Sequence, residues 1–511
     1  MNFARLIDES CQGAPSSTAL IIGDEQISYG ELGAQIGCVA SSLRRLGVQP
    51  GDRLALLMPN SFEYLVSYYA LLRVGAVAVP LNPLLREPEV RYILEDCQAS
   101  GLIFHQEFAS IVEALRAHLS SLHHAILVGD EGQAATLTFN DLLQTGDQES
   151  FTVDSADQDL ATLIYTSGMT GDPKGAMLSH RGLTASAQAT IEGFRFKSTD
   201  CIIGVLPFAH IFGKNLLVQA ALVAGASVVV MARFESTLVV EAIERWKATA
   251  LSGVPLMLIA LSNALEAQPK DISTLRKCMV GGTTVPMEVV RRFEGLFSNC
   301  EVVEAYGISE NSGIVTLNPL GGGHREHSAG LPLGLNEVRV VDDQGQDVPQ
   351  GLPGEIAIRG PQLLLAYWGM PEATAGAVRD GWLFTGDIGY LDEDGYLFLI
   401  DRKKDIIITS GYNVYPKEVE NVLYGHPDVE AAAVIGQPDD ARGEWVKAVI
   451  VLKEGATVTE DKMKEYCAGQ LAAYKTPRLI EFVDDLPRTA SGKILKRALR
   501  VDSEKPETSN P

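Results

Sequence analysis

A stretch dense in glycine, serine and threonine is the strongest chemical signal in the sequence. Residues 163–180 read LIYTSGMTGDPKGAMLSH, an apolar lead that runs into small and hydroxylated residues with one lysine. Glycines let backbone N–H groups approach an anion closely, hydroxyls add donors and a lysine adds positive charge. The Walker pattern is absent, because no Gly-Lys-Ser/Thr follows a glycine at the required spacing. The stretch predicts a phosphate-binding loop of another kind, with the candidate residues Thr166, Ser167, Gly168, Thr170, Gly171 and Lys174.

Four later segments hold residue types suited to nucleotide and acid chemistry. They read LPFAHIFG at 206–213, GGTTVP at 281–286, EAYGISE at 304–310 and DGWLFTGDIG at 380–389. Taken alone, each has an ordinary explanation, since a lone histidine is more often structural, paired glycines form turns and a single glutamate is a solvated surface group. Their joint presence and order therefore carry the argument.

The ordered pattern Tyr-Thr-Ser-Gly-x-Thr-Gly-x-Pro-Lys-Gly at 165–175 resembles the signature loop of the acyl-adenylate-forming superfamily. That superfamily comprises acyl-CoA synthetases, carrier-loading adenylation domains and firefly-type luciferases. The four later segments resemble its further motifs and occur in its order. The resemblance extends from Ser28 to Lys493 and is greatest to bacterial medium- and long-chain fatty-acid CoA ligases.

The resemblance implies a nucleotide site. Glu310, together with Thr166, would ligate Mg²⁺, which prefers hard oxygen ligands. Asp387 would accept hydrogen bonds from the ribose hydroxyls, and Arg402 would donate to the same region. The remaining nucleotide residues are Gly282, Thr283, Tyr306, Gly307 and Ser309, among which Tyr306 would stack on adenine.

The resemblance also implies a mobile catalytic lysine. Lys493, in PRTASGKI at 487–494, would bridge the acyl carboxylate and the α-phosphate, although alone it would be an exposed lysine in a turn. Lys404 corresponds to the family's hinge position, and Gly411 and Tyr412 would face coenzyme A. His210 would lie beside the acid, with an acid–base role only if it reaches a transferred proton.

These roles imply a two-step reaction, in which ATP and a carboxylic acid give acyl-AMP and pyrophosphate before coenzyme A takes the acyl group. The predicted acyl pocket is His210, Phe212, Gly213, Val254, Ile308 and Gly313. Its small, apolar members offer no evident charge for an ammonium or a second carboxylate, which favours a medium- or long-chain fatty acid. An aromatic acid of the hydroxycinnamate type and transfer to a carrier protein remain as alternatives.

The elements that position these residues alternate between apolar runs and amphipathic segments. Strands are expected at 53–59 and 76–80 around a helix at 63–74, and strands at 202–206 and 227–231 around a helix at 216–223. This alternation predicts α/β architecture with largely parallel sheets, followed by short strands and turns after about residue 330. We expect an adenylate-forming body at 1–401 with a β-rich subdomain, a hinge at 402–404, a mobile α+β domain at 405–500 and a disordered tail at 501–511.

Composition excludes several other classes. The 511 residues carry a net charge of −23, which argues against nucleic-acid binding and polybasic membrane attachment. Residues 1–401 account for −22 of this charge, and the rest is nearly neutral, with its basic residues Arg488, Lys493, Lys496, Arg497 and Arg500 expected to face ATP and coenzyme A. The start has no signal-peptide core and no apolar run spans a bilayer, which predicts a cytoplasmic monomer or homodimer with at most transient membrane contact. Seven scattered cysteines predict reduced structural thiols.

Overall fold

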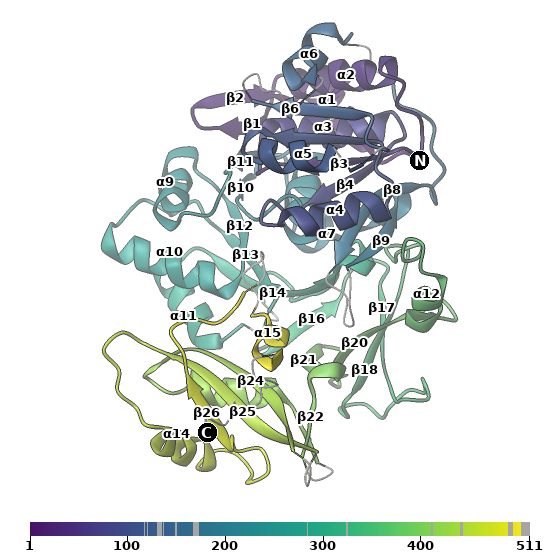
Figure 1. The fold of residues 1–511 in the computed structure, drawn as a ribbon. Helices are drawn as coiled ribbons and strands as arrows, with labels where there is room; N and C mark the ends of the chain where they lie inside the picture. Colours follow the sequence, from purple (N-terminus) through teal and green to yellow (C-terminus); the bar gives the residue numbers. More distant parts are fainter. Residues whose placement is uncertain are drawn as a thin grey trace, which may run out of the picture. The chain divides into compact units, whose positions relative to one another are not determined.

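The computed structural model describes residues 1–511 except 117, 120, 130–134, 136, 149–150, 167–172, 284, 323–324, 410–411, 440–442, 489–493 and 502–511. The chain forms two compact units. We call Met1–Val338 with Ile358–Leu383 the large unit, and Arg339–Ala357 with Phe384–Pro511 the small unit. Figure 1 traces the chain through both. The domain limits expected at 401–405 lie within the small unit and stay a prediction.

The first sheet of the large unit has the strand order β7-β6-β5-β3-β4-β8-β9. Neighbouring strands are parallel except for the antiparallel pair β8 and β9. Its strands are β3 (Arg53–Leu57), β4 (Val77–Leu81), β5 (Gly101–His105), β6 (His124–Val128), β7 (Leu137–Thr138), β8 (Leu160–Thr166) and β9 (Lys174–Ser179).

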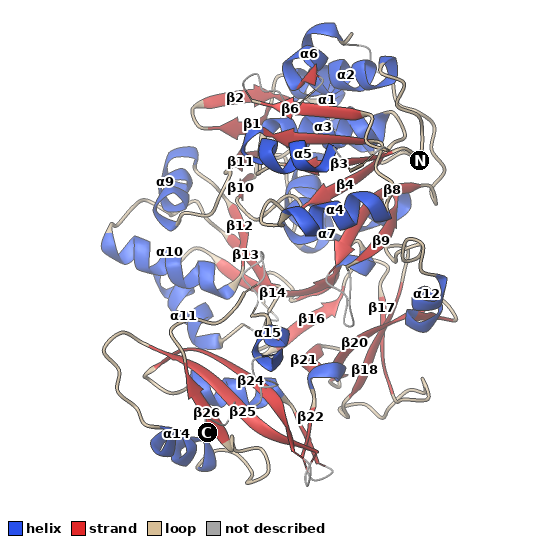
Figure 2. Ribbon diagram, in the orientation of Figure 1, coloured by secondary structure: helices blue, strands red, loops and turns tan. Residues whose placement is uncertain are grey.

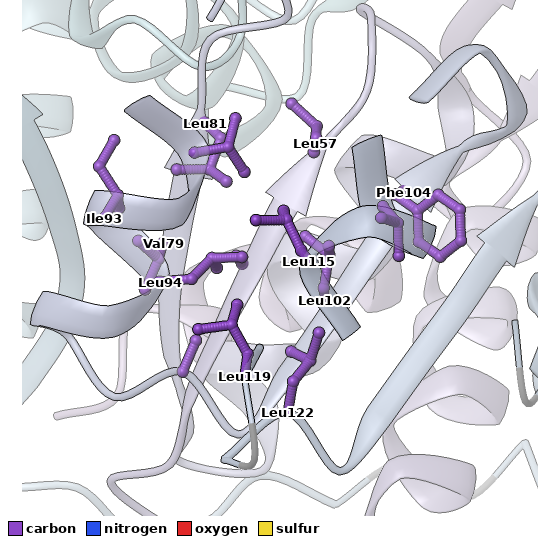
Figure 3. Close-up of a cluster of buried hydrophobic side chains, with 14 of the residues drawn as sticks. Leu57, Val79, Leu81, Ile93, Leu94, Leu102, Phe104, Leu115, Leu119 and Leu122 are labelled. Carbon is purple, nitrogen blue, oxygen red and sulfur yellow. The ribbon is translucent and has the colours of Figure 1, made fainter. Parts of the chain in front are cut away.

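An apolar cluster covers one face of this sheet. Helices α4 (Glu87–Asp96) and α5 (Ala109–Arg116) pack on it. Figure 3 shows Ile93 and Leu94 of α4 and Leu115 of α5 against Val79 and Leu102 of the strands. Because these side chains are almost fully removed from water, the burial of each stabilises the fold by roughly 1.5–3 kcal/mol. The sheet is therefore a rigid base for the loop that follows β8.

The second sheet of the large unit has the order β2-β1-β11-β10-β12-β13-β14-β15-β16. Its central strands are parallel, whereas β2, β15 and β16 are antiparallel to their neighbours. The strands are β1 (Thr18–Ile22), β2 (Glu25–Ser28), β10 (Cys201–Gly204), β11 (Ser227–Val230), β12 (Ala250–Gly253), β13 (Lys277–Gly281), β14 (Glu301–Ile308), β15 (Gly313–Leu317) and β16 (Ser328–Pro332).

Helices of the large unit fall into packed groups (Figure 2). One comprises α1 (Ala4–Gly13), α2 (Tyr29–Arg45), α3 (Phe62–Arg73) and α6 (Phe139–Thr145), and another comprises α9 (Ser236–Trp246), α10 (Pro255–Ala267) and α11 (Met287–Leu296). The remaining helical elements are η1 (Gln106–Phe108), α7 (His180–Gly193), α8 (Ala220–Val223), η3 (Ser309–Asn311) and α12 (Pro371–Ala377), with the short strand β19 (Val378–Arg379) after α12. Ser28 begins α2 with a reciprocal capping box to Glu31.

The strands and helices predicted above are present, but one of the helices is of a different type. The helix expected at 216–223 begins earlier and is a π-helix, η2 (Phe212–Gln219), that continues into α8. All eight residues of η2 are buried. π-Helical turns are rare and frequently occur at functional sites, so this segment is a candidate for chemistry as well as packing.

The small unit contains two strand groups. The chain enters and leaves it within β17 (Glu337–Val341), β18 (Gly354–Arg359) and β20 (Trp382–Leu391). These strands are neighbours in that order, and β20 pairs antiparallel with β21 (Leu397–Arg402). The second group has the order β23-β22-β25-β24, with β26 beside β25. Its elements after the turn η4 (Lys403–Asp405) are β22 (Ile407–Thr409), β23 (Tyr412–Val414), α13 (Pro416–Tyr424), β24 (Val429–Asp439), β25 (Gly443–Leu452), α14 (Glu460–Ala468), β26 (Leu479–Phe482) and α15 (Lys496–Val501).

All seven cysteines are buried and none is in a disulfide. Burial raises the pKa of several of the thiols, to about 11 for Cys11 and Cys467 and about 12 for Cys97. The structural role predicted for the cysteines agrees with this burial. In the described part of the chain, no helix is both long and apolar enough to cross a bilayer.

Candidate active site

The predicted phosphate loop connects β8 to β9 in the first sheet. Thr166 at the end of β8 pairs in register with Lys174 at the start of β9, so the two ends of the loop are fixed opposite each other. Helix α4 holds both ends, because Tyr92 Oη donates to the carbonyl of Pro173 at 3.2 Å and Tyr165 Oη donates to Asp96. Ser167, Gly168, Thr170 and Gly171 lie outside the described residues.

An extended segment beside β9 carries an aromatic residue that the sequence analysis missed. Backbone N–H groups of Leu365 and Trp368 donate to the carbonyls of Met177 and Gly175 at 2.8 Å, which aligns the segment along β9. Tyr367 Oη donates to Glu310 Oε1 at 3.0 Å, and the Lys174 ammonium lies 5.5 Å from the Tyr367 ring centroid. Burial and the Glu310 carboxylate raise the pKa of Tyr367, so the phenol remains a donor. The only sequence signal was the Tyr-Trp pair just ahead of Pro371.

Glu310 fits a magnesium ion that arrives with a nucleotide. Its described hydrogen bond engages Oε1, while the second carboxylate oxygen accepts none from the residues that the structure describes. No cluster of three or more acidic, histidine or cysteine side chains occurs among those residues. Magnesium is usually bound through one or two carboxylates plus substrate phosphates rather than by an all-protein cage, so a single oriented carboxylate matches that mode of binding.

The end of β14 is shaped by glycines. The β14–β15 register shifts between Tyr306 and Gly307. A Cβ at Gly307 would lie 2.3 Å from the carbonyl oxygen of Gly313, which no side chain tolerates. The turn after β14 then passes through Ser309 and Glu310 in η3 and through Ser312 and Gly313 with positive φ. The bulge and turn place the buried Tyr306 and the Glu310 carboxylate on one short segment.

The ends of β13 and β12 lie close to that segment. A Cβ at Gly281 would approach the Ala305 carbonyl oxygen of β14 to 2.6 Å, and Gly282 has a φ of +81°. A Cβ at Gly282 would lie 3.7 Å from the side chain of Val254, the residue before α10. Gly282 and Thr283 are exposed. The parallel strands therefore bring the predicted adenine residues to one sheet edge, as expected for α/β proteins.

His210 and the π-helix η2 form the predicted acyl side. The backbone N–H of Phe212 donates to His210 Nδ1 at 3.2 Å, which fixes the orientation of the imidazole ring at the start of η2. A Cβ at Gly213 would meet the carbonyl oxygens of Pro207 and Leu206 at 2.5 and 2.7 Å. At the other predicted wall, a Cβ at Gly313 would lie 2.5 Å from Leu216.

The π-helix η2 contains a buried titratable side chain. Lys214, the residue after Gly213, is fully buried, and burial lowers its pKa well below the usual value. Lys214 directly follows Gly213 of the predicted acyl wall in the sequence, and that wall, with the expectation that it offers no charge, stays a prediction.

The predicted residues of the small unit form a separate set. Asp387 and Arg402 pair in register across β20 and β21, and Arg402 Nε lies 3.1 Å from Asp387 Oδ1. Lys404 is exposed in η4, and Tyr412 stacks on Tyr474 with centroids 4.8 Å apart. Gly411 and Lys493 lie outside the described residues.

Two basic residues near the end of the chain are paired within the small unit. Lys496 Nζ lies 2.8 Å from Glu420 Oε1, and Arg500 lies 3.2 Å from Asp405. Burial lowers the pKa of Lys496, but Glu420 and Asp401 outweigh it and raise that pKa. These two charges are balanced inside the unit, so the expectation that they face polyphosphates is not supported; the Arg497 side chain lies outside the described residues.

Comparison with known proteins assigns both parts of the chain. The family of AMP-binding enzymes matches residues 7–368, and the AMP-binding enzyme C-terminal domain matches residues 418–493. A feruloyl-CoA synthase from Amycolatopsis sp is 38% identical over 95% of this chain and 96% of its own length. A long-chain-fatty-acid–CoA ligase from Bacillus subtilis (strain 168) is 33% identical over 97% and 93%. The crystal structure of the anthranilate CoA ligase AuaEII in complex with anthranoyl-AMP matches with a TM-score of 0.93 at 31% identity, over 99% and 97% of the two chains.

Proposed function

We propose an acid and a set of residue roles for this chain, which belongs to the AMP-binding enzyme family and is an AMP-forming acid–thiol ligase that uses ATP, Mg²⁺ and coenzyme A. A carboxylate is a poor acyl donor because oxide is a poor leaving group. Attack of the carboxylate oxygen on the ATP α-phosphate forms acyl-AMP and expels pyrophosphate. The coenzyme A thiolate then attacks the acyl carbon and AMP leaves, so no protein residue becomes acylated.

On the nucleotide side, we assign each motif residue to one part of ATP. Lys174 and the Thr166–Gly171 loop bind the phosphates, and Tyr306 stacks on adenine. Asp387 and Arg402 hold the ribose, a role supported by their cross-strand pairing at 3.1 Å. Glu310 holds Mg²⁺, whose charge offsets that of the phosphates. The other contacts come from Gly282, Thr283, Gly307 and Ser309.

On the acid side, we assign Lys493 to the acyl carboxylate and the α-phosphate, where its charge reduces the repulsion between two anions. His210 is assigned to a position beside the carboxylate, its ring oriented by the hydrogen bond that Nδ1 accepts from the Phe212 backbone. Phe212, Gly213, Val254, Ile308 and Gly313 line the acyl chain. Lys404 is the hinge, and Gly411 and Tyr412 lie on the coenzyme A side.

The acid that the observations favour is an aromatic acid of the hydroxycinnamate type. The observation that carries this choice is the buried polar side chain of Lys214 within η2, because a polar wall suits an acid that has polar atoms beyond its carboxylate. The 38% identity to a feruloyl-CoA synthase supports it. A medium- or long-chain fatty acid is the second candidate, favoured by the 33% identical long-chain ligase.

A substrate panel tests the choice of acid. AMP release with coenzyme A present is measured for hydroxycinnamates, benzoates and saturated fatty acids from short to long. We expect the highest kcat/KM for a hydroxycinnamate. A higher kcat/KM for fatty acids would replace this proposal with the second candidate, and AMP release without coenzyme A consumption would indicate another acyl acceptor.

A further inference from the structure

The buried lysine in η2 lacks the partners that such a group normally has. Lys214 Nζ donates to Asn215 Oδ1 at 2.6 Å and lies 3.6 Å from the centroid of the Tyr68 ring. No carboxylate pairs with it among the described residues. An ammonium has three N–H donors, so one hydrogen bond and one ring face leave its capacity unfilled.

A second buried lysine shows what a purely structural lysine looks like in this protein. Lys277 Nζ lies 2.9 Å from Asp200 and donates to the carbonyls of Phe194 and Arg195 at 3.1 and 3.0 Å. It also lies over the rings of Phe194 and Phe196. Lys277 is therefore fully satisfied, whereas Lys214 is not, although both are buried in the same unit.

Polar atoms of two other buried side chains in the large unit are also unsatisfied. Gln219, one π-helical turn further along η2, has both side-chain polar atoms buried without a hydrogen-bond partner in the described structure, as has the hydroxyl of Ser252 in β12. Buried polar groups in native proteins are almost always paired, so these atoms require an explanation.

His210 lies just ahead of η2 in the chain, and Lys214 lies within this helix. The Lys214 backbone N–H donates to the His210 carbonyl at 3.1 Å, which places Lys214 one helical turn after His210 along the chain. Asn215 Nδ2 donates to the Ser312 carbonyl at 3.1 Å, so η2 packs on the turn that carries Glu310 and Gly313. An acid whose carboxylate lies beside His210 would extend its far end toward Lys214.

We propose that Lys214 is a specificity-determining residue, whose amino group binds an oxygen atom at the end of the acid remote from the carboxylate, namely the phenolic oxygen of a hydroxycinnamate. This inference rests on the proposed function. One N–H of the amino group donates to the phenolic oxygen while another donates to Asn215 Oδ1. An acid without that oxygen leaves the amine unpaired.

The test compares two acids that differ by one oxygen. For the wild-type enzyme, kcat/KM for AMP release with coenzyme A is measured for 4-hydroxycinnamate and for cinnamate. We expect a preference for 4-hydroxycinnamate of about tenfold or more, because a site that hydrogen-bonds a hydroxyl rejects the analogue lacking it. In Lys214→Met, which keeps an unbranched side chain, the ratio falls to near one, because no amino group is left to bind the hydroxyl or to stay unpaired beside cinnamate.

Lys277→Met is the matched control. It removes a satisfied buried lysine and is expected to lower the melting temperature while the ratio between the two acids stays at the wild-type value. An unchanged ratio in folded Lys214→Met overturns the role of Lys214. If that variant does not fold, the wild-type ratio decides, and a value near one overturns the inference.

The outcomes also separate this inference from the proposal on which it rests. A wild-type enzyme that activates fatty acids but neither cinnamate refutes the proposed acid. A wild-type enzyme that activates both cinnamates equally leaves that acid in place and refutes only the role of Lys214.

Discussion

Tyr367 joins the predicted magnesium ligand to the strand that follows the phosphate loop. Tyr367→Phe removes the donor to Glu310 and retains the ring near Lys174. Removing groups that orient a metal ligand typically costs 10–100-fold in metal affinity or activity. We therefore expect the Mg²⁺ concentration for half-maximal ATP–pyrophosphate exchange to rise about tenfold.

The control for this prediction is Tyr424→Phe, which removes a tyrosine hydroxyl that bonds the Ala432 carbonyl and not Glu310. Its Mg²⁺ requirement should match that of the wild type. Identical Mg²⁺ titrations for Tyr367→Phe and the wild type would show that Tyr367 does not orient a metal ligand.

His180 makes stability depend on pH. It is buried, its Nδ1 accepts from the Phe3 backbone N–H at 3.1 Å, and burial lowers its pKa from 6.5 to about 4. Below pH 6.5 the unfolded chain binds a proton that the folded chain refuses, so stability is lost as pH falls toward 4. We expect urea denaturation to show about 2–3 kcal/mol less stability at pH 4.5 than at pH 7 from this group.

His180→Asn isolates that effect, because an amide oxygen can replace Nδ1 as an acceptor and does not titrate. The variant should lose this part of the pH dependence. An equally steep decline in both proteins would assign acid sensitivity to other groups.

At the residue scale, motif order identified the residues that bear on chemistry but not their partners. Glu310 and Lys174 were predicted, whereas Tyr367, which contacts both, was not, because its role depends on pairing between β9 and a segment almost two hundred residues away. Lys214 was passed over as part of a small, apolar pocket, because sequence alone does not show whether a lysine is exposed. Burial and long-range contacts are the information that local patterns lack.

The β14–β15 hairpin is the element on which the adenine side depends. Gly307→Ala would place a Cβ 2.3 Å from a backbone oxygen that cannot move without breaking the ladder. We expect a loss of about 1–3 kcal/mol in the free energy of unfolding, typical of overpacking, and a raised KM for ATP. Chemical denaturation and pyrophosphate exchange measure the two effects.

Gly295→Ala serves as the control, since Gly295 lies within α11 and its Cβ would meet no atom within 4 Å. Alanine is the better helix former, so this variant should be as stable as the wild type or up to about 1 kcal/mol more stable. Equal behaviour of the two variants would mean that the hairpin adapts.

At the element scale, hydrophobic periodicity located β3 and β4 of the first sheet, β10 and β11 of the second and the helix α3 to within a few residues. It failed at η2, whose eight residues are buried all round and so give no polar face to define a start. A π-helix differs from an α-helix in hydrogen bonding and not in composition, which is why no sequence pattern distinguished it.

The whole molecule must serve two half-reactions, and the hinge assigned to Lys404 is the part that would permit this. Lys404→Pro restricts φ at the turn η4. We expect the rate of thioester formation from supplied acyl-adenylate to fall at least about tenfold, because hinges absorb large backbone changes at few residues, while pyrophosphate exchange is largely retained.

Lys404→Ala removes the same charge without restricting φ, so it should retain both half-reactions. If thioester kinetics in Lys404→Pro equal those of the wild type, the hinge lies elsewhere. Equal loss in both variants would indicate that the lysine charge, and not backbone freedom, matters.

The burial of all seven cysteines has a practical consequence for following that motion. Because every native thiol is shielded and those of Cys11, Cys97 and Cys467 have raised pKa values, the surface carries no readily alkylated group. One cysteine introduced on an exposed position of each unit would therefore accept a fluorophore pair without a prior cysteine-free background. Energy transfer between the two dyes would then record the distance between the units in real time, through adenylation and thioester formation, in an otherwise native enzyme.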